Sequence, residues 1–404
     1  MNKQYVPGRC TAALIAMAAV FANAPAHATS IFIDPTDGYF DASTYLLEYP
    51  YGVLPVPIII TEPALGGSGG GLMGMFFHES EEERAKRQTR AQNSKDASRF
   101  LFPPAVTIVG AAATSNGSKG ALVGHMAFWK EGRLRYRGGV GHAKFYMDYY
   151  GTPDYRIENG IEIETDGTLI SQTLTYKPFK PPFFIGMKQF YINSAVRPTK
   201  NVDLSHAPII EAIVDNFTDE KKSSGLGIVA TWDSRNNYFS PHQGHYMETQ
   251  MVFNDDAFGS DYEYDSYTAY GHHYGYWNPH DIGVRWNYAT IETDERYLPP
   301  YAIPMVEMRG GPSGYYQGEH VGVIETEYRY HFNHRWMGLG FIGVGRAADH
   351  FNELDDQSGA VGKGLGFRYL IARQLGFQMG VDFADGPDGF AWYIQAGSAW
   401  GQKE

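Results

Sequence analysis

The sequence predicts an all-β fold, a transmembrane antiparallel β-barrel of about 16 strands. Segments that alternate apolar and polar residues recur along most of the chain, and turn-forming residues separate them. The 404 residues include 47 glycines, 15% aromatic residues and one cysteine, while the mean hydropathy is only −0.36. Transmembrane barrels combine aromatic girdles with low average hydropathy because lipid-facing and lumen-facing residues alternate. A soluble β-sandwich of this size would show longer apolar core strands.

Residues 1–28 are predicted to be a cleaved secretory signal. Lys3 and Arg9 form a charged n-region, an apolar stretch follows, and AHA at 26–28 is a small-residue cleavage site. The apolar run is too short to span a membrane as a helix. Cys10 lies in this segment, so the expected mature chain has neither a thiol nor a disulfide.

Residues 29–62 are predicted to be an extended periplasmic lead-in. The motifs DPTDGYFD and YPYGVLPVPIII in this segment are rich in proline and turn residues and have no helical period. The barrel is assigned to residues 63–404. The formal net charge of −12 argues against a nucleic-acid partner.

The first barrel strand is predicted at 64–77, ALGGSGGGLMGMFF, and the sixteenth at 390–400. Alternate residues from Phe390 to Trp400 are mostly aromatic or aliphatic, so this face of the last strand is expected to contact lipid. Asp166 and Gly167 are predicted to form a tight turn between the strands GIEIET and TLISQTLTYKPF. An even strand number places both barrel ends in the periplasm, and this parity depends on GIEIET being a separate strand.

The segment GLGIVATWDSRNNYFSPHQG at 225–244 resembles the BamA/TamA-type superfamily of outer-membrane assembly and translocation barrels, also called the bacterial surface antigen family. The resemblance is clearest over residues 223–400. The residues that match the strand and loop motifs of the family are Asp233, Arg235, Pro241, Gly244, Met308, Arg309, Gly310, Gly311, Glu327, Arg329, Gly364, Gly366, Arg368, Asp382 and Ala384.

Three features depart from the family pattern. Gly311 replaces the aromatic residue that follows Arg-Gly in the loop motif, although Tyr315 and Tyr316 lie nearby. Gly343 stands where a strand aspartate often receives the loop arginine. The segment between residue 28 and the first predicted strand has no room for the periplasmic POTRA modules that deliver substrate in assembly factors. We therefore expect a periplasmic partner to supply that role.

The resemblance implies that a long extracellular loop folds into the lumen and carries Arg309 to carboxylates on the barrel wall. A guanidinium is always charged, so confining it requires fork-like hydrogen bonds to acids. Gly310 and Gly311 let the backbone turn tightly there. On this interpretation, Arg309→Ala should destabilise the barrel more than Arg335→Ala.

The candidate partners of Arg309 are Glu327, which is the preferred one, and Asp382. Glu327 alternates in phase with Glu325 and Arg329 in the motif ETEYRY, so all three side chains are expected to face the lumen. Tyr328 is then expected to face lipid.

By the same resemblance, a lateral seam lies between the first and last strands, and the residues assigned to it are Gly66, Gly69, Gly70 and Trp400. Glycine-rich strands pack few side chains and pair weakly. Asp233 and Arg235 share a strand face and are predicted to form a charge ladder near the periplasmic rim. A gate or turn-docking role is the alternative for this pair.

The resemblance implies a role in protein assembly, insertion or translocation at the outer membrane of a Gram-negative bacterium. The expected partners are outer-membrane lipid and lipopolysaccharide, unfolded outer-membrane or secreted polypeptides, and the periplasmic partner named above. The alternative function is a passive pore or structural surface antigen without insertase activity.

The sequence predicts no enzyme, cofactor or metal site. GGSGG at 66–70 matches the G-x-S-x-G pattern around Ser68, but no helix follows it, as a nucleophile elbow requires. His272 and His273 place their rings on opposite faces of a strand, which is poor geometry for one metal ion.

Overall fold

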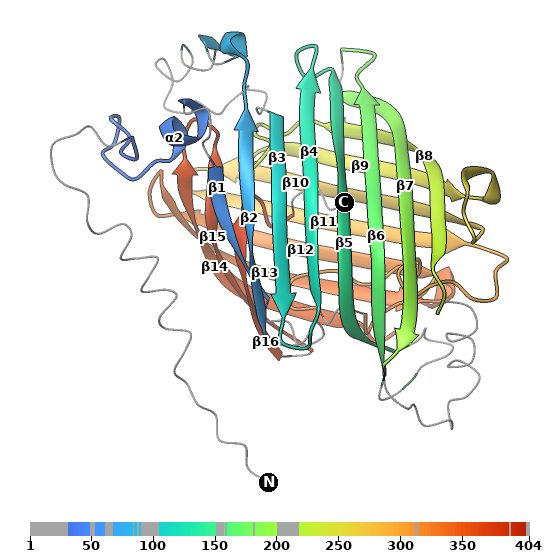
Figure 1. The fold of residues 1–404 in the computed structure, drawn as a ribbon. Helices are drawn as coiled ribbons and strands as arrows, with labels where there is room; N and C mark the ends of the chain where they lie inside the picture. The colour runs from blue at the N-terminus through green and yellow to red at the C-terminus, as the bar shows by residue number, and fades with distance from the viewer. Residues whose placement is uncertain are drawn as a thin grey trace.

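The computed structural model describes residues 31–48, 53–60, 68–83, 85–86, 89, 105–150, 157, 160–180, 182–199, 218–311, 314–387 and 389–400. Within these residues, 16 antiparallel strands follow one another in chain order, each paired with the next. The sheet curves into a nearly closed barrel, and the short helix α2 (Ser43–Glu48) lies at one end of it (Figure 1). The predicted fold class and strand number are confirmed.

The strands have these bounds: β1 Val53–Ile60, β2 Gly69–His78, β3 Ala105–Thr114, β4 Lys119–Trp129, β5 Leu134–Tyr149, β6 Ile161–Tyr176, β7 Phe183–Pro198, β8 Lys221–Asp233, β9 Gly244–Asn254, β10 Tyr264–Trp277, β11 His280–Glu292, β12 His320–His331, β13 Trp336–Ala348, β14 Ala360–Ala372, β15 Phe377–Gly386 and β16 Gly389–Ala396.

Alternation along each strand separates an outer face from an inner one. In β12, Glu325, Glu327 and Arg329 are buried inside and Tyr328 is exposed outside, as the sequence predicts, and Ile324 is exposed on the same outer face. The exposed outer side chains are apolar or aromatic along most strands, which suits contact with lipid. None of the described helices is long and apolar enough to cross a membrane.

The predicted turn at Asp166 and Gly167 is wrong, because β6 runs unbroken through both residues. Asp166 pairs with Lys144 of β5 and with Ala195 of β7. Gly167 faces Ser194, and a Cβ atom on Gly167 would lie 2.5 Å from that of Ser194. The glycine therefore marks a close approach of two strands rather than a turn.

The barrel begins earlier than predicted, because β1 lies inside the segment expected to be a lead-in. All eight residues of β1 pair with β2. Pro55 and Pro57 suggested a loop, but proline is tolerated in an edge strand. The extra strand β1 and the merged strand β6 compensate each other, which is why the predicted count of 16 agrees with the structure.

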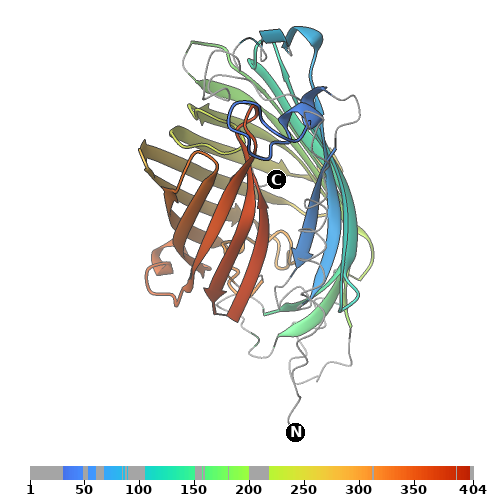
Figure 2. The same cartoon turned by 90° about the vertical axis from the view of Figure 1, so that its left-hand side faces the viewer.

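The two edges of the sheet are β1 and β16, which lie next to each other (Figure 2). Across the described residues, no ladder of backbone hydrogen bonds joins them. The seam assigned from sequence is therefore displaced: Gly69 and Gly70 belong to β2 and pair on both sides. Gly66 lies outside the described residues. Trp400 lies beyond the end of β16 and is only 2% exposed, so its predicted contact with lipid is wrong.

One end of the barrel, which we call the turn end, carries several short connections together with the long one between β2 and β3, residues 79–104. There β10 joins β11, β12 joins β13 and β14 joins β15 through two to four residues. Residues 31–48 also pack at this end, since Ala42 N–H donates to the carbonyl of Ile371 at the end of β14. The opposite end, the loop end, carries the long connection 293–319 between β11 and β12.

An insertion experiment tests the continuity of β6. A short epitope inserted after Asp166 should abolish the heat-modifiable, folded band on a gel, because it interrupts the ladder of 16 residue pairs with β5 and the ladder of 14 pairs with β7. The same epitope inserted between Lys130 and Glu131, exposed in the β4–β5 turn, should leave the folded band in place. A folded band with the Asp166 insertion would contradict the single long strand.

Candidate functional site

The loop between β11 and β12 carries Arg309 against the inner face of the barrel. Val306 and Met308 are buried against Val321 and Val323 of β12, which fixes the backbone on either side of the arginine. Arg309 itself is 8% exposed. A guanidinium at this burial requires compensating charge.

Three carboxylates supply that charge. Glu325 Oε1 accepts from Nε of Arg309 at 2.8 Å and from Nη2 at 2.5 Å. Nη1 lies 2.8 Å from Asp382 Oδ2 and 2.6 Å from Glu327 Oε2. The ring of Phe341 covers the guanidinium, with its centroid 3.7 Å from Cζ. Both predicted partners, Glu327 and Asp382, contact Arg309. Glu325, which was not a predicted partner, accepts hydrogen bonds from two of the arginine nitrogens.

The presence of glycine at position 343, where the family often has an aspartate, explains the role of Glu325. Gly343 and Glu325 are directly paired across β12 and β13. A Cβ atom on Gly343 would lie 3.1 Å from Cγ of Glu325 and 3.3 Å from Sδ of Met308. The missing side chain therefore makes room for both residues, and Glu325 provides the acid that position 343 lacks.

Glycines in β14 and β15 allow the loop backbone to lie directly on the wall. A Cβ atom on Gly362 would lie 2.1 Å from the carbonyl oxygen of Arg309, and one on Gly386 would lie 1.7 Å from that of Gly310. Gly310 adopts φ +75, a conformation that favours glycine. Any side chain at these wall positions would displace the arginine loop.

Two other family glycines stand beside the arginine site. Gly364 pairs with Phe341, whose ring occupies the space next to it, and Gly366 pairs with Asp382. Arg368 binds the same aspartate through two nitrogens, at 2.6 and 2.9 Å. Asp382 is fully buried, and its charge is balanced by two arginines, Arg309 and Arg368.

Aromatic residues from the C-terminal end replace the aromatic residue missing after Arg309-Gly310. The hydroxyl of Tyr393 on β16 accepts from the N–H of Gly310 at 3.3 Å. The indole Nε1 of Trp400 donates to Glu325 Oε1 at 2.6 Å. The chain thus folds back into the barrel after β16 and shares a carboxylate with the loop arginine.

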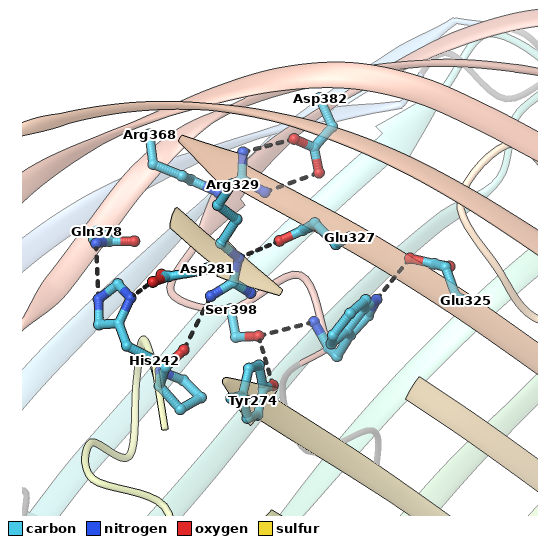
Figure 3. A network of polar contacts seen from close by, with 12 residues as sticks. His242, Tyr274, Asp281, Glu325, Glu327, Arg329, Arg368, Gln378, Asp382 and Ser398 are labelled. Atoms are coloured by element: carbon cyan, nitrogen blue, oxygen red, sulfur yellow. Dashed lines mark hydrogen bonds and ion pairs between the residues drawn. The ribbon is translucent and has the colours of Figure 1, made fainter. Parts of the chain in front are cut away.

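The charged network continues toward the turn end (Figure 3). Arg329 donates through Nε to Glu327 at 2.5 Å and through Nη1 to the carbonyl of Pro241 at 2.9 Å. Pro241 belongs to the connection between β8 and β9, so the network ties this connection to β12. Gly244, with φ +99, begins β9 directly after it.

Asp233 and Arg235 form the predicted charge pair at the other side of this connection. Arg235 binds Asp233 through Nε at 2.8 Å and Nη2 at 3.0 Å, and Arg135 of β5 binds the same carboxylate at 2.6 Å. Arg235 also lies over the ring of Tyr246, 4.2 Å from its centroid. The pair fixes the start of the β8–β9 connection to the wall.

The β8–β9 connection, residues 234–243, crosses the inside of the turn end to the seam. Phe239 packs edge-on against Phe377 of β15 at 5.2 Å and Phe77 of β2 at 6.1 Å. Its carbonyl accepts from the N–H of Ser398, just beyond β16, at 2.7 Å. This segment, which we call the crossing turn, therefore contacts both sides of the seam.

Residues 31–48 are anchored at the turn end by arginine–aspartate contacts. Three nitrogens of Arg335 bind Asp34, Asp37 and Asp41 at 2.7 to 2.8 Å. Arg373 also binds Asp34. Because the side chain of Arg335 is fully buried, the comparison of Arg309→Ala with Arg335→Ala expected from sequence cannot separate a buried arginine from an exposed one.

The model of the Omp85 superfamily domain matches residues 97–302, just over half of the chain. The chain therefore belongs to the Omp85 superfamily, an outer-membrane β-barrel family, and the BamA-type resemblance is confirmed. The match starts upstream of residue 223, where the sequence resemblance becomes clear, and ends before the Arg309 motif. No curated protein matches the chain.

Solved structures with a similar fold include BamA from Haemophilus ducreyi lacking POTRA domains 1-3. It has a TM-score of 0.50 and 11% identity, with 85% of this chain and 68% of that chain covered. CdiB from Acinetobacter baumannii and CdiB from Escherichia coli have TM-scores of 0.48 and 0.49 at 10% identity. Each covers 85% of this chain, which spans 58% and 61% of their lengths. The likeness to BamA shows the barrel fold.

Substitution of Arg309 tests the energetic importance of the site. Arg309→Ala removes the guanidinium that three buried carboxylates share, and Glu325 loses both of its hydrogen bonds to it. The variant should lower the free energy of unfolding by about 3–5 kcal/mol in urea titrations of the detergent-solubilised barrel. Arg309→Lys should recover only part of this loss, since an ammonium group cannot bind as a fork. The matched control is Arg197→Ala: this side chain is 44% exposed, lies 4.0 Å from Glu164, and should change stability by less than about 1 kcal/mol. If Arg309→Ala and Arg197→Ala lowered the free energy of unfolding equally, the buried arginine site would not stabilise the barrel as proposed.

Acid should release residues 31–48 from the turn end. Burial opposes ionisation of Asp37, but hydrogen bonds from Arg335, the N–H of Tyr39 and His334 outweigh it and lower its pKa to about 2. A lowered pKa in the folded state stabilises docking above the ordinary value of 3.8, and this stabilisation is lost as the pH falls toward 2.

Pepsin cleavage near Leu46, normalised to an unfolded substrate, measures the release. Cleavage should rise between pH about 4 and about 2, and Asp37→Asn should be cleaved already at the upper end of this range. Cleavage that stays constant across the range would contradict the ionic anchor.

Proposed function

We propose that this barrel assembles or translocates polypeptides at the outer membrane of a Gram-negative bacterium, to which residues 1–28 direct it as a cleaved signal. Membership of the Omp85 superfamily supports this assignment. The observation that carries it is the seam, where β1 and β16 lie side by side without a ladder in the described residues. A seam of this kind gives a polypeptide strand an unpaired edge onto which it can add.

The composition of β1 keeps this edge weak. β1 has eight residues, whereas β5, β6 and β7 have sixteen each. Proline has no backbone N–H, and it is tolerated in an edge strand where that missing donor lies on the unpaired side. Pro55 and Pro57 are two residues apart and therefore point their missing donors toward the same edge. Opening such a seam breaks few hydrogen bonds.

The interior near the seam supports the passage or docking of a chain. A cavity of about 430 Å³ lies inside the barrel, and its lining includes Val106, Ile108, Tyr238, Phe239 and Phe377. These side chains are apolar or aromatic, which suits the lipid-facing residues of an incoming barrel strand. The crossing turn forms part of this lining, so its movement would change access from the turn end to the seam.

The proposed orientation places the turn end in the periplasm. A substrate polypeptide would arrive there, with a separate periplasmic protein in the role that POTRA modules play in assembly factors. The apolar outer face would contact lipid, and the loop end would face lipopolysaccharide at the cell surface.

Closure of the seam tests the proposal. Cys10 is the only cysteine in the sequence, so pairs of cysteines can be introduced without competing thiols in the mature chain. A scan of pairs joining β1 to β16 should identify disulfides that abolish the folding of a urea-denatured outer-membrane barrel presented to liposomes containing this protein. Reduction of the disulfide should restore folding to the wild-type rate.

The matched control joins β1 to β2 through Val56→Cys and Met73→Cys, which are already paired in the ladder and leave the seam free. This variant should retain wild-type activity when oxidised. No acceleration of folding by the wild-type protein over empty liposomes would refute the assembly role. A wide, steady conductance in planar bilayers would instead identify a passive pore.

A further inference from the structure

Three potential metal ligands from separate parts of the chain meet at the turn end. His242 lies in the crossing turn, Asp281 is the second residue of β11, and His331 is the last residue of β12. His331 Nε2 lies 2.9 Å from Asp281 Oδ2. His242 Nδ1 contacts the same oxygen (Figure 3). One ligand atom from each residue lies within 4.8 Å of the others.

We propose that His242, Asp281 and His331 form a binding site for Zn²⁺. Two imidazole nitrogens and one carboxylate oxygen are ligands that zinc accepts in proteins. Ligand atoms around a tetrahedral zinc ion stand about 3.3 Å apart, given bonds of about 2.0–2.1 Å. Small side-chain rotations bring the three atoms from their present separations to this value, and a water molecule completes the coordination.

The state of Asp281 is the second observation that points to a cation. The carboxylate is 1% exposed, and its Oδ1 has no hydrogen-bond partner among the described residues. A buried carboxylate oxygen without a donor is costly. The nearby Arg329 does not remove this cost, because it is bound to Glu327 and to the Pro241 carbonyl. A divalent cation would use the free oxygen and neutralise the charge.

A further contact orients one of the imidazoles. The side-chain amide of Gln378, on β15, lies 3.5 Å from Nε2 of His242. The two ends of a glutamine amide are assigned from their contacts, and with the oxygen facing the ring, Gln378 accepts a hydrogen bond from Nε2–H. This arrangement leaves Nδ1 free to bind metal, and metal-bound histidines usually have such a partner on the second nitrogen.

Zinc at this position would fix the crossing turn. The side chains of His242 and His331 are 26% and 19% exposed, so the ion can enter from the turn end. Bound zinc would tie the turn to β11 and β12 on one side, while Phe239 holds it at the seam on the other. Metal binding goes beyond the proposed assembly function and does not require it.

Spacing along the sequence cannot reveal this site. His242 and Asp281 are 39 residues apart, and Asp281 and His331 are 50 residues apart. The closure of the barrel brings β8–β9, β11 and β12 together at one end, so the ligand set exists only in the folded chain.

Metal titration of the full-length, chelator-treated barrel in detergent tests the site. Calorimetry should show one bound Zn²⁺ per chain, and Co²⁺ should give the visible absorption of tetrahedral coordination. His242→Gln, Asp281→Asn and His331→Gln should each weaken Zn²⁺ binding at least about tenfold while keeping the heat-modifiable folded band. The control is His245→Gln: His245 and His273 lie 3.0 Å apart, and no carboxylate of the described part of the chain joins them in a ligand group, so this variant should bind as the wild type does.

Hydrogen exchange provides a readout independent of affinity. Zn²⁺ should slow exchange of the amides of residues 234–243 in the wild type and should have no such effect in His242→Gln. Absence of Zn²⁺ binding by the wild type, or unchanged binding in both His242→Gln and Asp281→Asn, would overturn the proposal. Loss of binding in His245→Gln would assign the metal to the outer face instead. Zinc binding without slower exchange in residues 234–243 would refute the claim that zinc fixes the crossing turn.

Discussion

The burial of ionised groups is the constraint on which the interior of this barrel depends. Arg309 cannot lose its charge, so the wall opposite it must present acids, and Glu325, Glu327 and Asp382 do so within 2.8 Å. These acids in turn need Arg329 and Arg368 to remain balanced. The glycines of β13, β14 and β15 leave the space that the arginine loop and these ion pairs occupy. Each part is costly alone and stabilising in combination.

Local periodicity explains what could be predicted. Side-chain direction in a strand is set by a period of two residues, so the inward faces of β12 and β15 follow from ETEYRY and GVDFADG without knowledge of the fold. The choice among inward acids is different, because it depends on distances across several strands. Glu325 and Glu327 have the same phase, and only the space beside Gly343 decides that Glu325 receives two of the arginine nitrogens.

The errors at strand boundaries have a common physical origin. Glycine and proline usually indicate turns. Glycine can also allow two strands to approach closely, and proline is tolerated in an edge strand. Gly167 marks close packing against Ser194, and Pro55 lies in an edge strand, so neither interrupts the sheet. Trp400 continues the alternation of β16 in sequence, yet the chain leaves the sheet after Ala396 because Glu325 offers its indole a buried acceptor. Tertiary contacts of this kind leave no local pattern.

The shared acceptor Glu325 also has a consequence for biogenesis. The arginine site needs residues 309, 325, 382 and 400, so it stays incomplete until residue 400 has been delivered to the membrane. A nascent barrel in which Trp400 is not yet in place would hold the loop less tightly, because contacts to one carboxylate are energetically coupled. The interior is therefore locked only after all four of these residues are in place, and a barrel in which Trp400 has not reached Glu325 would remain loose and open to proteases.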